Sequence, residues 1–188
     1  MSYSPRAIMP GILLGILAII FLTGLVSSPA AANPPAVVET VPKQPEKAPS
    51  ACEISPSYPD TIQQWCLLIG VYAVENALDP NLVAAVMLQE SGGDAQAYSH
   101  SGAVGLMQVM PRDGIAASFM CANGPCFASR PSMDELFDPA FNLSYSCTML
   151  AGLVSKYGNV RDALRAYGPM DMGYGYADIV LGIYERYR

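Results

Sequence analysis

Apolar residues recur at helical spacing in several stretches of this chain, and proline, glycine or asparagine separates one stretch from the next. The clearest stretch runs over 80–90. There Val83, Val86 and Met87 fall on one face at positions i, i+3 and i+4, and Glu90 takes position i+7 on the same face. The pattern predicts an amphipathic helix whose apolar stripe ends in a carboxylate.

Both ends of this helix carry residues that local chemistry favours there. Asp79 precedes Pro80, which matches an N-cap carboxylate followed by proline at the first helical position, and Gly92-Gly93 suits the C-terminus. A carboxylate on a core-facing stripe is desolvated, so we expect a raised pKa for Glu90, as a general acid near neutral pH requires. The alternative is a helix-terminal glutamate that reaches solvent.

The remaining apolar spacing predicts four more helices, and no stretch alternates strongly enough to predict a long strand. A loop covers 92–131, and a short hairpin within 92–104 would fit there. We therefore expect a mainly α fold, a single helical domain with at most a small β-hairpin. The four further helices are predicted over 59–77, 139–157, 160–167 and 174–187.

The front of the chain differs from the rest. Residues 1–32 hold an arginine, an apolar run over 8–26 and an Ala-x-Ala cleavage pattern, which together are typical of a secretory signal peptide. The run is also long enough to span a bilayer, so an uncleaved N-terminal membrane anchor is the alternative. Residues 33–55 are rich in proline, which predicts an extended linker, and 56–188 has the size of one domain. Either way we expect export, to a periplasm or to a cell surface.

Charge excludes some classes of partner. The chain carries 16 acidic and 10 basic residues, and Arg6, Lys43 and Lys47 precede the domain. The domain is therefore net acidic and lacks the basic stripe of a nucleic-acid binder. The chain has one histidine and no zinc-type spacing of cysteine and histidine, so neither a metal site nor a cofactor is expected. We expect a monomer, attached to a membrane only through the N-terminal segment.

Five cysteines in an exported chain predict disulfides with one thiol left over. Cys121 and Cys126 flank the turn sequence Ala-Asn-Gly-Pro, so we expect this pair to be bonded. Cys66 and Cys147 both lie on apolar helical stripes, so they either pair with each other or stay as buried thiols. Cys52 is then the expected odd cysteine, and a Cys52–Cys66 bridge is the alternative.

Two motifs in the centre of the chain resemble the catalytic core of the soluble-type lytic transglycosylases, which share the goose-type lysozyme fold and cut bacterial peptidoglycan. The first motif is a glutamate followed by a serine at a helix end, and Glu90-Ser91 matches it. The resemblance covers about 62–187 and implies an α+β lysozyme-like domain with a catalytic cleft. The second motif reads Ser-x-x-Gly-Ala-x-Gly-Leu-Met-Gln followed closely by Met-Pro, and it is matched by Ser99, Gly102, Ala103, Gly105, Leu106, Met107, Gln108, Met110 and Pro111.

The third motif of the family is matched only in part. Asp138-Pro139 with Asn142 resembles the family's Asp-Pro-x-x-Asn stretch. The family's usual Ala-Tyr-Asn-x-Gly is replaced by Ala-Tyr-Gly-Pro over 166–169, which keeps the tyrosine and loses the asparagine and the later glycine. The resemblance places Tyr167 near the catalytic carboxylate. Tyr176 belongs to a stretch that resembles the family's closing Tyr-x-x-x-Val.

The resemblance implies that Glu90 is the catalytic residue and that several neighbours bind substrate. Gln108 would hydrogen-bond an acetamido or hydroxyl group of the sugar, or else orient its own loop. Met107 would form part of the cleft wall or pack in the core. The implied substrate-binding residues are Ser91, Ser99, Gly105, Leu106, Met107, Gln108, Asn142, Tyr167 and Tyr176.

The activity implied is cleavage of the β-1,4 bond between N-acetylmuramic acid and N-acetylglucosamine in peptidoglycan glycan strands, with formation of 1,6-anhydro-N-acetylmuramic acid. Glu90 would act first as acid and then as base. One alternative is a hydrolytic muramidase of the goose-lysozyme kind, which would need Asp94 or Asp113 as a second carboxylate. The other is a catalytically inactive module that only binds the cell wall.

Overall fold

The computed structural model describes residues 52–188. The predicted signal peptide or anchor (1–32) and the greater part of the predicted linker (33–55) lie outside the described residues. Within 52–188, no helix combines the length and the hydropathy that crossing a membrane requires.

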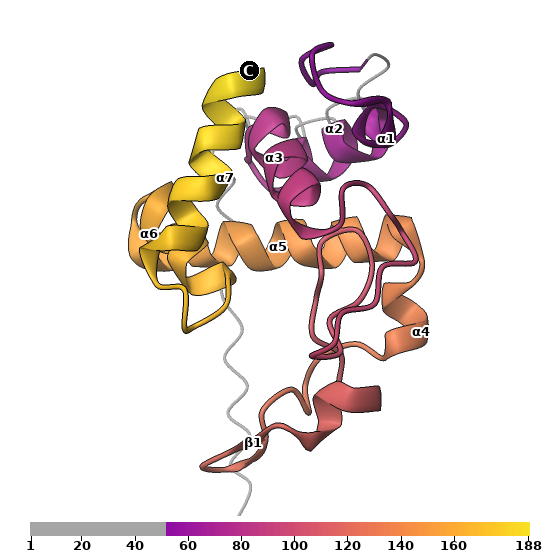
Figure 1. Cartoon of the computed structure of the whole chain (residues 1–188), viewed down its shortest axis with the longest axis vertical. Helices are drawn as coiled ribbons and strands as arrows, with labels where there is room; N and C mark the ends of the chain where they lie inside the picture. Colours follow the sequence, from indigo (N-terminus) through magenta and orange to yellow (C-terminus); the bar gives the residue numbers. More distant parts are fainter. Residues whose placement is uncertain (1–51) are drawn as a thin grey trace, which may run out of the picture. The chain divides into compact units, whose positions relative to one another are not determined.

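Helices dominate the described chain, as the spacing of its apolar residues predicts (Figure 1). The sheet found in 52–188 has two short antiparallel strands, so the mainly α fold class is confirmed. The helices are α1 (Asp60–Gln63), α2 (Cys66–Glu75), α3 (Pro80–Glu90), α4 (Met133–Leu136), α5 (Pro139–Tyr157), α6 (Val160–Tyr167) and α7 (Tyr174–Tyr187), with a 3₁₀ turn, η1, at Gly114–Ser118 and strands β1 (Met120–Cys121) and β2 (Gly124–Pro125).

The helix predicted over 59–77 is wrong as a continuous element. It is broken into α1 and α2 at Gln64 and Trp65. The Trp65 indole donates a hydrogen bond of 2.8 Å to the carbonyl of Gly93, just beyond α3. The break turns the indole toward this distant carbonyl, while Ile62 and Ile69 stay fully buried on either side of it. A contact across 28 residues therefore overrides the local helical spacing.

Helix α5 runs through the middle of the domain and packs against α2, α4 and α6 (Figure 1). The Asp138 carboxylate accepts the backbone N–H of Phe141, which caps the first turn. Gly158 ends the helix with a φ of 76°, in the left-handed region that glycine adopts without strain. The side chains that α5 buries are those of Asn142, Leu143, Ser146, Cys147 and Leu150.

Helix α3 lies between α2 and α7 and packs against both (Figure 1). Its residues 82–87 are all buried, so apolar packing surrounds this helix rather than one stripe of it. The Asp79 carboxylate caps it by accepting the backbone N–H of Asn81 at 2.8 Å, as predicted. The same carboxylate accepts a hydrogen bond of 2.6 Å from the Tyr184 hydroxyl of α7. These contacts hold the N-terminal end of α3, opposite the end that carries Glu90, against α7.

The long loop after α3 holds the β-structure, but not where the sequence predicts it. Within 92–104 there is only the isolated bridge of Tyr98 with Val104, which also bridges to Val109. The hairpin of β1 and β2 lies farther on, where Met120 pairs with Pro125 and Cys121 with Gly124. The tight turn between Cys121 and Cys126 brings β1 and β2 side by side as a hairpin, and the segment 92–104 has no such turn closed by a disulfide.

Two disulfides are present in the described chain. Cys121 is bonded to Cys126, which confirms the predicted pair. Cys66 is bonded to Cys52, which is the alternative that the sequence leaves open, so the expectation that Cys52 is the odd cysteine is wrong. Cys147 is the free, buried thiol of the described chain. The physical reason lies between the bonded residues: Ile54 and Tyr58 are buried in the core, and this folds the chain back over the start of α2.

Candidate functional site

Glu90 is the last residue of α3 and is half-buried. One of its carboxylate oxygens accepts a short hydrogen bond from the Tyr176 hydroxyl of α7. Burial raises the pKa of Glu90 to about 7, against the smaller lowering effect of the Tyr176 hydrogen bond. The predicted pKa shift and its cause, desolvation at the end of an apolar helix, are therefore confirmed. A carboxyl group of this kind is protonated in part at neutral pH and can both give and take a proton.

Tyr176 comes from the first turn of α7 and is buried. Burial and then the neighbouring charge of Glu90 raise the pKa of its phenol, so the hydroxyl stays a donor toward the carboxylate. Its ring stacks on that of Tyr167, with centroids 6.4 Å apart and planes 18° apart. We call these two residues the tyrosine pair.

The hydroxyl of Tyr167 does not donate to Glu90. It donates to the carbonyl of Met107, 2.9 Å away, in the loop that carries the second motif. Its ring stacks on that of Tyr176, which hydrogen-bonds Glu90, so Tyr167 lies beside this contact. Burial and then the charge of Glu90 raise the pKa of Tyr167. The hydrogen bond to Glu90 comes from Tyr176, in the stretch that resembles the family's closing motif.

The altered third motif has a steric reason in this chain. A Cβ atom at Gly168, where the family usually has asparagine, would overlap the ring of Tyr176. Glycine at this position therefore lets the Tyr176 ring approach the end of α6 and keep its place beside Tyr167 and Glu90. The sequence shows the lost asparagine, but only the structure shows which side chain uses the space.

The second motif forms a tight loop at the end of α3. The Ser91 hydroxyl donates to the carbonyl of Leu106 at 2.8 Å, and the Ser99 hydroxyl accepts the N–H of Ala103 at 2.8 Å. Gln108 adopts a left-handed φ of 45°, and its side-chain amide donates to the carbonyls of Ala97 and Gly105. The interpretation of Gln108 as a residue that orients its own loop is the one these contacts favour.

Asn142 of α5 fixes this loop through its side-chain amide. Its side-chain oxygen accepts the N–H of Met107 at 3.0 Å, and its side-chain nitrogen donates to the carbonyls of Val104 at 3.0 Å and Leu136 at 2.9 Å. A Cβ atom at Gly105, whose φ is 74°, would overlap the Asn142 amide. Glycine is therefore needed where the loop meets α5.

Three of the implied substrate-binding residues cannot take that role through their side chains. Leu106, Met107 and Asn142 are fully buried, so the implied substrate contact through these side chains is corrected; for Met107 this is the core packing that the sequence leaves open as the alternative. Apolar packing holds Leu106 and Met107, and three hydrogen bonds hold the Asn142 amide, so these side chains fix the loop and have no path to a bound sugar. The Met107 backbone links two residues of the site: its N–H donates to the Asn142 side chain, and its carbonyl accepts the Tyr167 hydroxyl.

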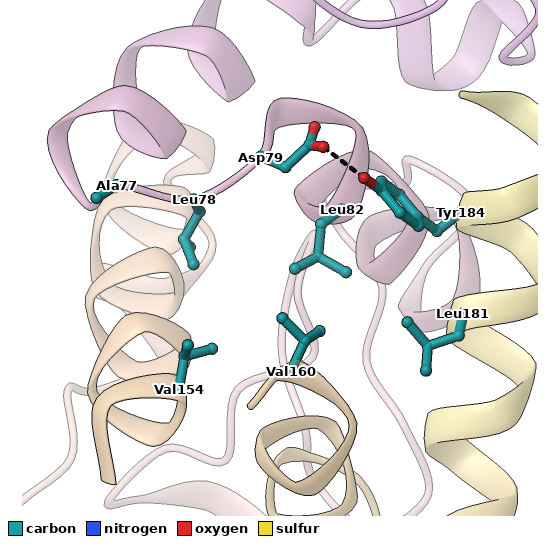
Figure 2. A pocket seen from close by; sticks show the side chains of 8 residues that line it. All are labelled: Ala77, Leu78, Asp79, Leu82, Val154, Val160, Leu181 and Tyr184. Atoms are coloured by element: carbon teal, nitrogen blue, oxygen red, sulfur yellow. Dashed lines mark hydrogen bonds between the residues drawn. The ribbon is translucent and has the colours of Figure 1, made fainter. Parts of the chain in front are cut away.

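A separate cavity of about 200 Å³ lies where α3, α5, α6 and α7 approach the turn after α2 (Figure 2). None of the residues that the sequence assigns to the site lines it. Its wall is apolar except for the hydrogen-bonded pair of Asp79 and Tyr184. In the described part of the chain, no cluster of three or more metal-ligating side chains occurs. The lining residues are Ala77, Leu78, Asp79, Leu82, Val154, Val160, Leu181 and Tyr184.

Comparison with known proteins adds independent information. The chain is 30% identical over 106 residues to membrane-bound lytic murein transglycosylase E of Buchnera aphidicola, a match that covers 56% of this chain and 47% of the relative. It is 36% identical over 104 residues to a transglycosylase of Enterobacteria phage PRD1, which covers 55% of this chain and 34% of that protein. The chain thus spans less than half the length of these relatives.

Among solved structures, an inactive mutant of the lytic transglycosylase Slt from Pseudomonas aeruginosa superimposes with a TM-score of 0.49. The sequence identity is 22%, over 64% of this chain and 23% of that one. The family model described as the transglycosylase SLT domain matches residues 68–170, which is more than half of this chain and includes Glu90 and the whole loop of the second motif. The chain belongs to the transglycosylase SLT domain family.

Proposed function

We propose that this domain is a peptidoglycan lytic transglycosylase. The observation that carries the proposal is Glu90, a half-buried carboxyl group with a pKa of about 7 held by the Tyr176 hydroxyl, inside a domain of the SLT family. The proposed substrate is the β-1,4 bond between N-acetylmuramic acid and N-acetylglucosamine. The family match supports this substrate class, and the relatives are named for the same reaction.

In the first step, protonated Glu90 donates its proton to the glycosidic oxygen as the bond to C1 of N-acetylmuramic acid breaks. Positive charge develops at C1, as in other glycosidases. The Tyr176 hydroxyl already donates to the carboxyl group, so it stabilises the negative charge that Glu90 acquires as the proton leaves.

In the second step, the 6-hydroxyl of the same sugar attacks C1 and Glu90 takes up its proton. The product ends in a 1,6-anhydro ring, and Glu90 returns to its protonated form. A single carboxylate is enough because the nucleophile is part of the substrate. An aligned intramolecular attack has an effective concentration on the order of 10⁵ M or more, which outcompetes water.

A hydrolytic muramidase would need a second carboxylate to activate water. Both candidates accept backbone N–H groups: Asp94 that of Gln96, two residues on, and Asp113 that of Met133 at the start of α4, twenty residues on. These structural contacts of the two carboxylates favour the mechanism with one carboxylate. A module that only binds the wall would have no use for a carboxyl group with a raised pKa.

The test is the mass of the products that the purified domain releases from peptidoglycan. Anhydro ends support the proposal, water-added ends support the muramidase, and absence of cleavage supports the binding module. Glu90→Gln should lower the rate by roughly 10²- to 10⁴-fold, because the amide cannot protonate the leaving oxygen. Wall binding should persist, and substantial residual cleavage would remove Glu90 from the acid role.

We further propose that the domain works outside the cytoplasm, in a periplasm or at a cell surface, where its substrate lies. Residues 1–32 would direct export or anchor the protein, residues 33–55 would act as a linker, and 56–188 would form the enzyme domain, working as a monomer. Several relatives are named as membrane-bound, which supports the anchored arrangement. Sequencing the N-terminus of the exported protein distinguishes a cleaved signal from an anchor.

A further inference from the structure

Arg130 differs from every other cation in the described chain. Residues 52–188 contain seven lysines and arginines, and all except Arg130 are exposed. Arg130 is half-buried, in the segment between the small hairpin and α4. Among the described residues, the ion pairs are formed by Arg112, Arg161 and Arg188, so Arg130 has no carboxylate partner there.

The guanidinium of Arg130 lies among aromatic and thioether groups. It stands 5.9 Å from the ring centre of Phe127 and 6.0 Å from that of Tyr145 on α5. One of its nitrogens donates to the sulfur of Met149, 2.7 Å away and one turn farther along α5. A thioether is a weak acceptor, so most of the five donors of the guanidinium remain free for a stronger one.

Packing explains the position of this side chain but not its charge. A half-buried cation without an anion loses hydration that weak contacts do not replace, so a methionine or a leucine would fill the same space at lower cost. The domain is also acidic, with 14 aspartates and glutamates against seven lysines and arginines in residues 52–188. Among the described lysines and arginines, Arg130 is the one partly desolvated cation.

Arg130 also lies on the side of the domain where the site is built. Tyr145 and Met149 follow Asn142 along α5 by about one and two turns. Asn142 holds Met107, which accepts the hydroxyl of Tyr167. Burial and the charge of Glu90 raise the pKa of Tyr167, and the charge of Arg130 lowers it, so this phenol lies within electrostatic range of both charges.

We propose that Arg130 binds a carboxylate of the peptide carried by the lactyl group of N-acetylmuramic acid, and so makes the enzyme prefer glycan strands that bear peptides. The inference rests on the proposed function. In N-acetylmuramic acid the lactyl group is attached at O3, on a different ring carbon from the C1 where the bond breaks, and the peptide it carries bears free carboxylates. A planar guanidinium with free donors suits a carboxylate, which it can hold through two hydrogen bonds.

The test compares two substrates, glycan strands with their peptides and the same strands after an amidase has removed the peptides. The parent should cleave peptide-bearing strands better, and Arg130→Met should lower kcat/KM on them by roughly tenfold to a hundredfold. The same variant should cleave peptide-free strands as the parent does. Arg130→Lys should keep part of the preference, because it keeps the charge without the planar fork.

Arg165→Met is the matched control. Arg165 is exposed, forms no ion pair in residues 52–188 and also lies over an aromatic ring, that of Tyr174 at 4.9 Å. Arg165→Met removes one positive charge, as Arg130→Met does, and should leave the preference for peptide-bearing strands intact. A second measurement needs no variant: amidation of the peptide carboxylates should abolish the parent's preference.

Equal losses of Arg130→Met on both substrates, or a preference that survives amidation, would overturn the assignment of Arg130 while leaving the transglycosylase proposal in place. A parent that cleaves neither substrate overturns the proposed function and this inference with it. Thermal unfolding of Arg130→Met and Arg165→Met separates lost recognition from lost structure, since only a structural role predicts a lower Tm with both substrates affected.

Discussion

The loop over 99–111 and the tyrosine pair, Tyr167 and Tyr176, both surround Glu90, but they do so by different means. The loop is fixed through its backbone, by the Asn142 amide and by the hydroxyls of Ser91 and Ser99. The tyrosine pair acts through side chains, and Tyr176 donates the hydrogen bond that the Glu90 side chain accepts within 52–188. The long, recognisable motif therefore builds the frame, while the direct chemical contact comes from a stretch with a weak pattern.

The largest expected effect on stability comes from releasing the loop over 99–111 from Asn142. Asn142→Ala removes three buried hydrogen bonds and leaves the Met107 N–H and the Leu136 carbonyl unpaired, while the Val104 carbonyl keeps the N–H of Val109. We expect it to lower the free energy of unfolding by roughly 3–5 kcal/mol. Urea unfolding measures this. Asn123→Ala, at an exposed turn, is the control. A loss below about 1 kcal/mol would mean that apolar packing alone fixes the loop.

The next effect concerns Glu90 itself and its dependence on pH. Its pKa is about 7 in the folded protein and near 4.5 ordinarily, so folding takes up a proton between these values. The parent's free energy of unfolding should therefore fall as the pH rises from about 4.5 to 7, by up to roughly 3 kcal/mol. Glu90→Gln lacks this loss, so it should be more stable than the parent at pH 8 and similar to it at pH 4. Urea unfolding at both pH values, with exposed Glu75→Gln as control, tests the sign.

Tyr176→Phe tests the contribution of the tyrosine pair apart from that of the loop over 99–111. It removes the hydrogen bond that lowers the pKa of Glu90, so the fall in kcat/KM at alkaline pH should move to higher pH. The rate should drop about tenfold, because one charge-assisted hydrogen bond to the developing carboxylate is lost. A pH profile of the rate shows both effects. An unchanged profile would mean that Tyr176 only packs beside the acid.

Tyr167→Phe should have the smallest effect and a different character. Its hydroxyl donates to the carbonyl of Met107, so the variant should lose about 1 kcal/mol of stability and some rate, without moving the pH profile. The contrast with Tyr176→Phe is the measurement that counts. If Tyr167→Phe shifted the profile and Tyr176→Phe did not, the roles of the two tyrosines would be reversed.

The sequence predicts those elements whose ends are fixed by neighbouring residues. Helices α3, α5, α6 and α7 lie where the pattern places them, because Asp79, Asp138 and Asn159 cap locally and Gly158 ends α5. The place of Glu90 on a buried side of α3 also follows from local spacing, since it continues the stripe of Val83, Val86 and Met87, and its raised pKa agrees with that place.

Most errors involve contacts between distant residues; the misplaced hairpin is the exception, since β1 and β2 pair across a local turn. Trp65 breaks a helix to reach Gly93, and Tyr176 reaches Glu90 across 86 positions. No local pattern says which of two tyrosines will meet a carboxylate. Cys52 was assigned to the odd thiol because the residues before 56 resemble a linker in composition. Arg130 carries no motif at all, and only its burial and missing ion pair single it out.

The Cys52–Cys66 bridge determines how tension would enter this domain. A pull on the chain before Cys52 passes through the two sulfur atoms to the first residue of α2 and bypasses the residues between them. Tyr58, whose hydroxyl donates to the carbonyl of Asn81, and helix α1 then bear no load. Since α2 packs on α5, the force is transmitted to the central helix and does not unfold the domain from its N-terminal end. Reduction of this bond would convert a domain loaded at its middle into one that unzips from its first residues.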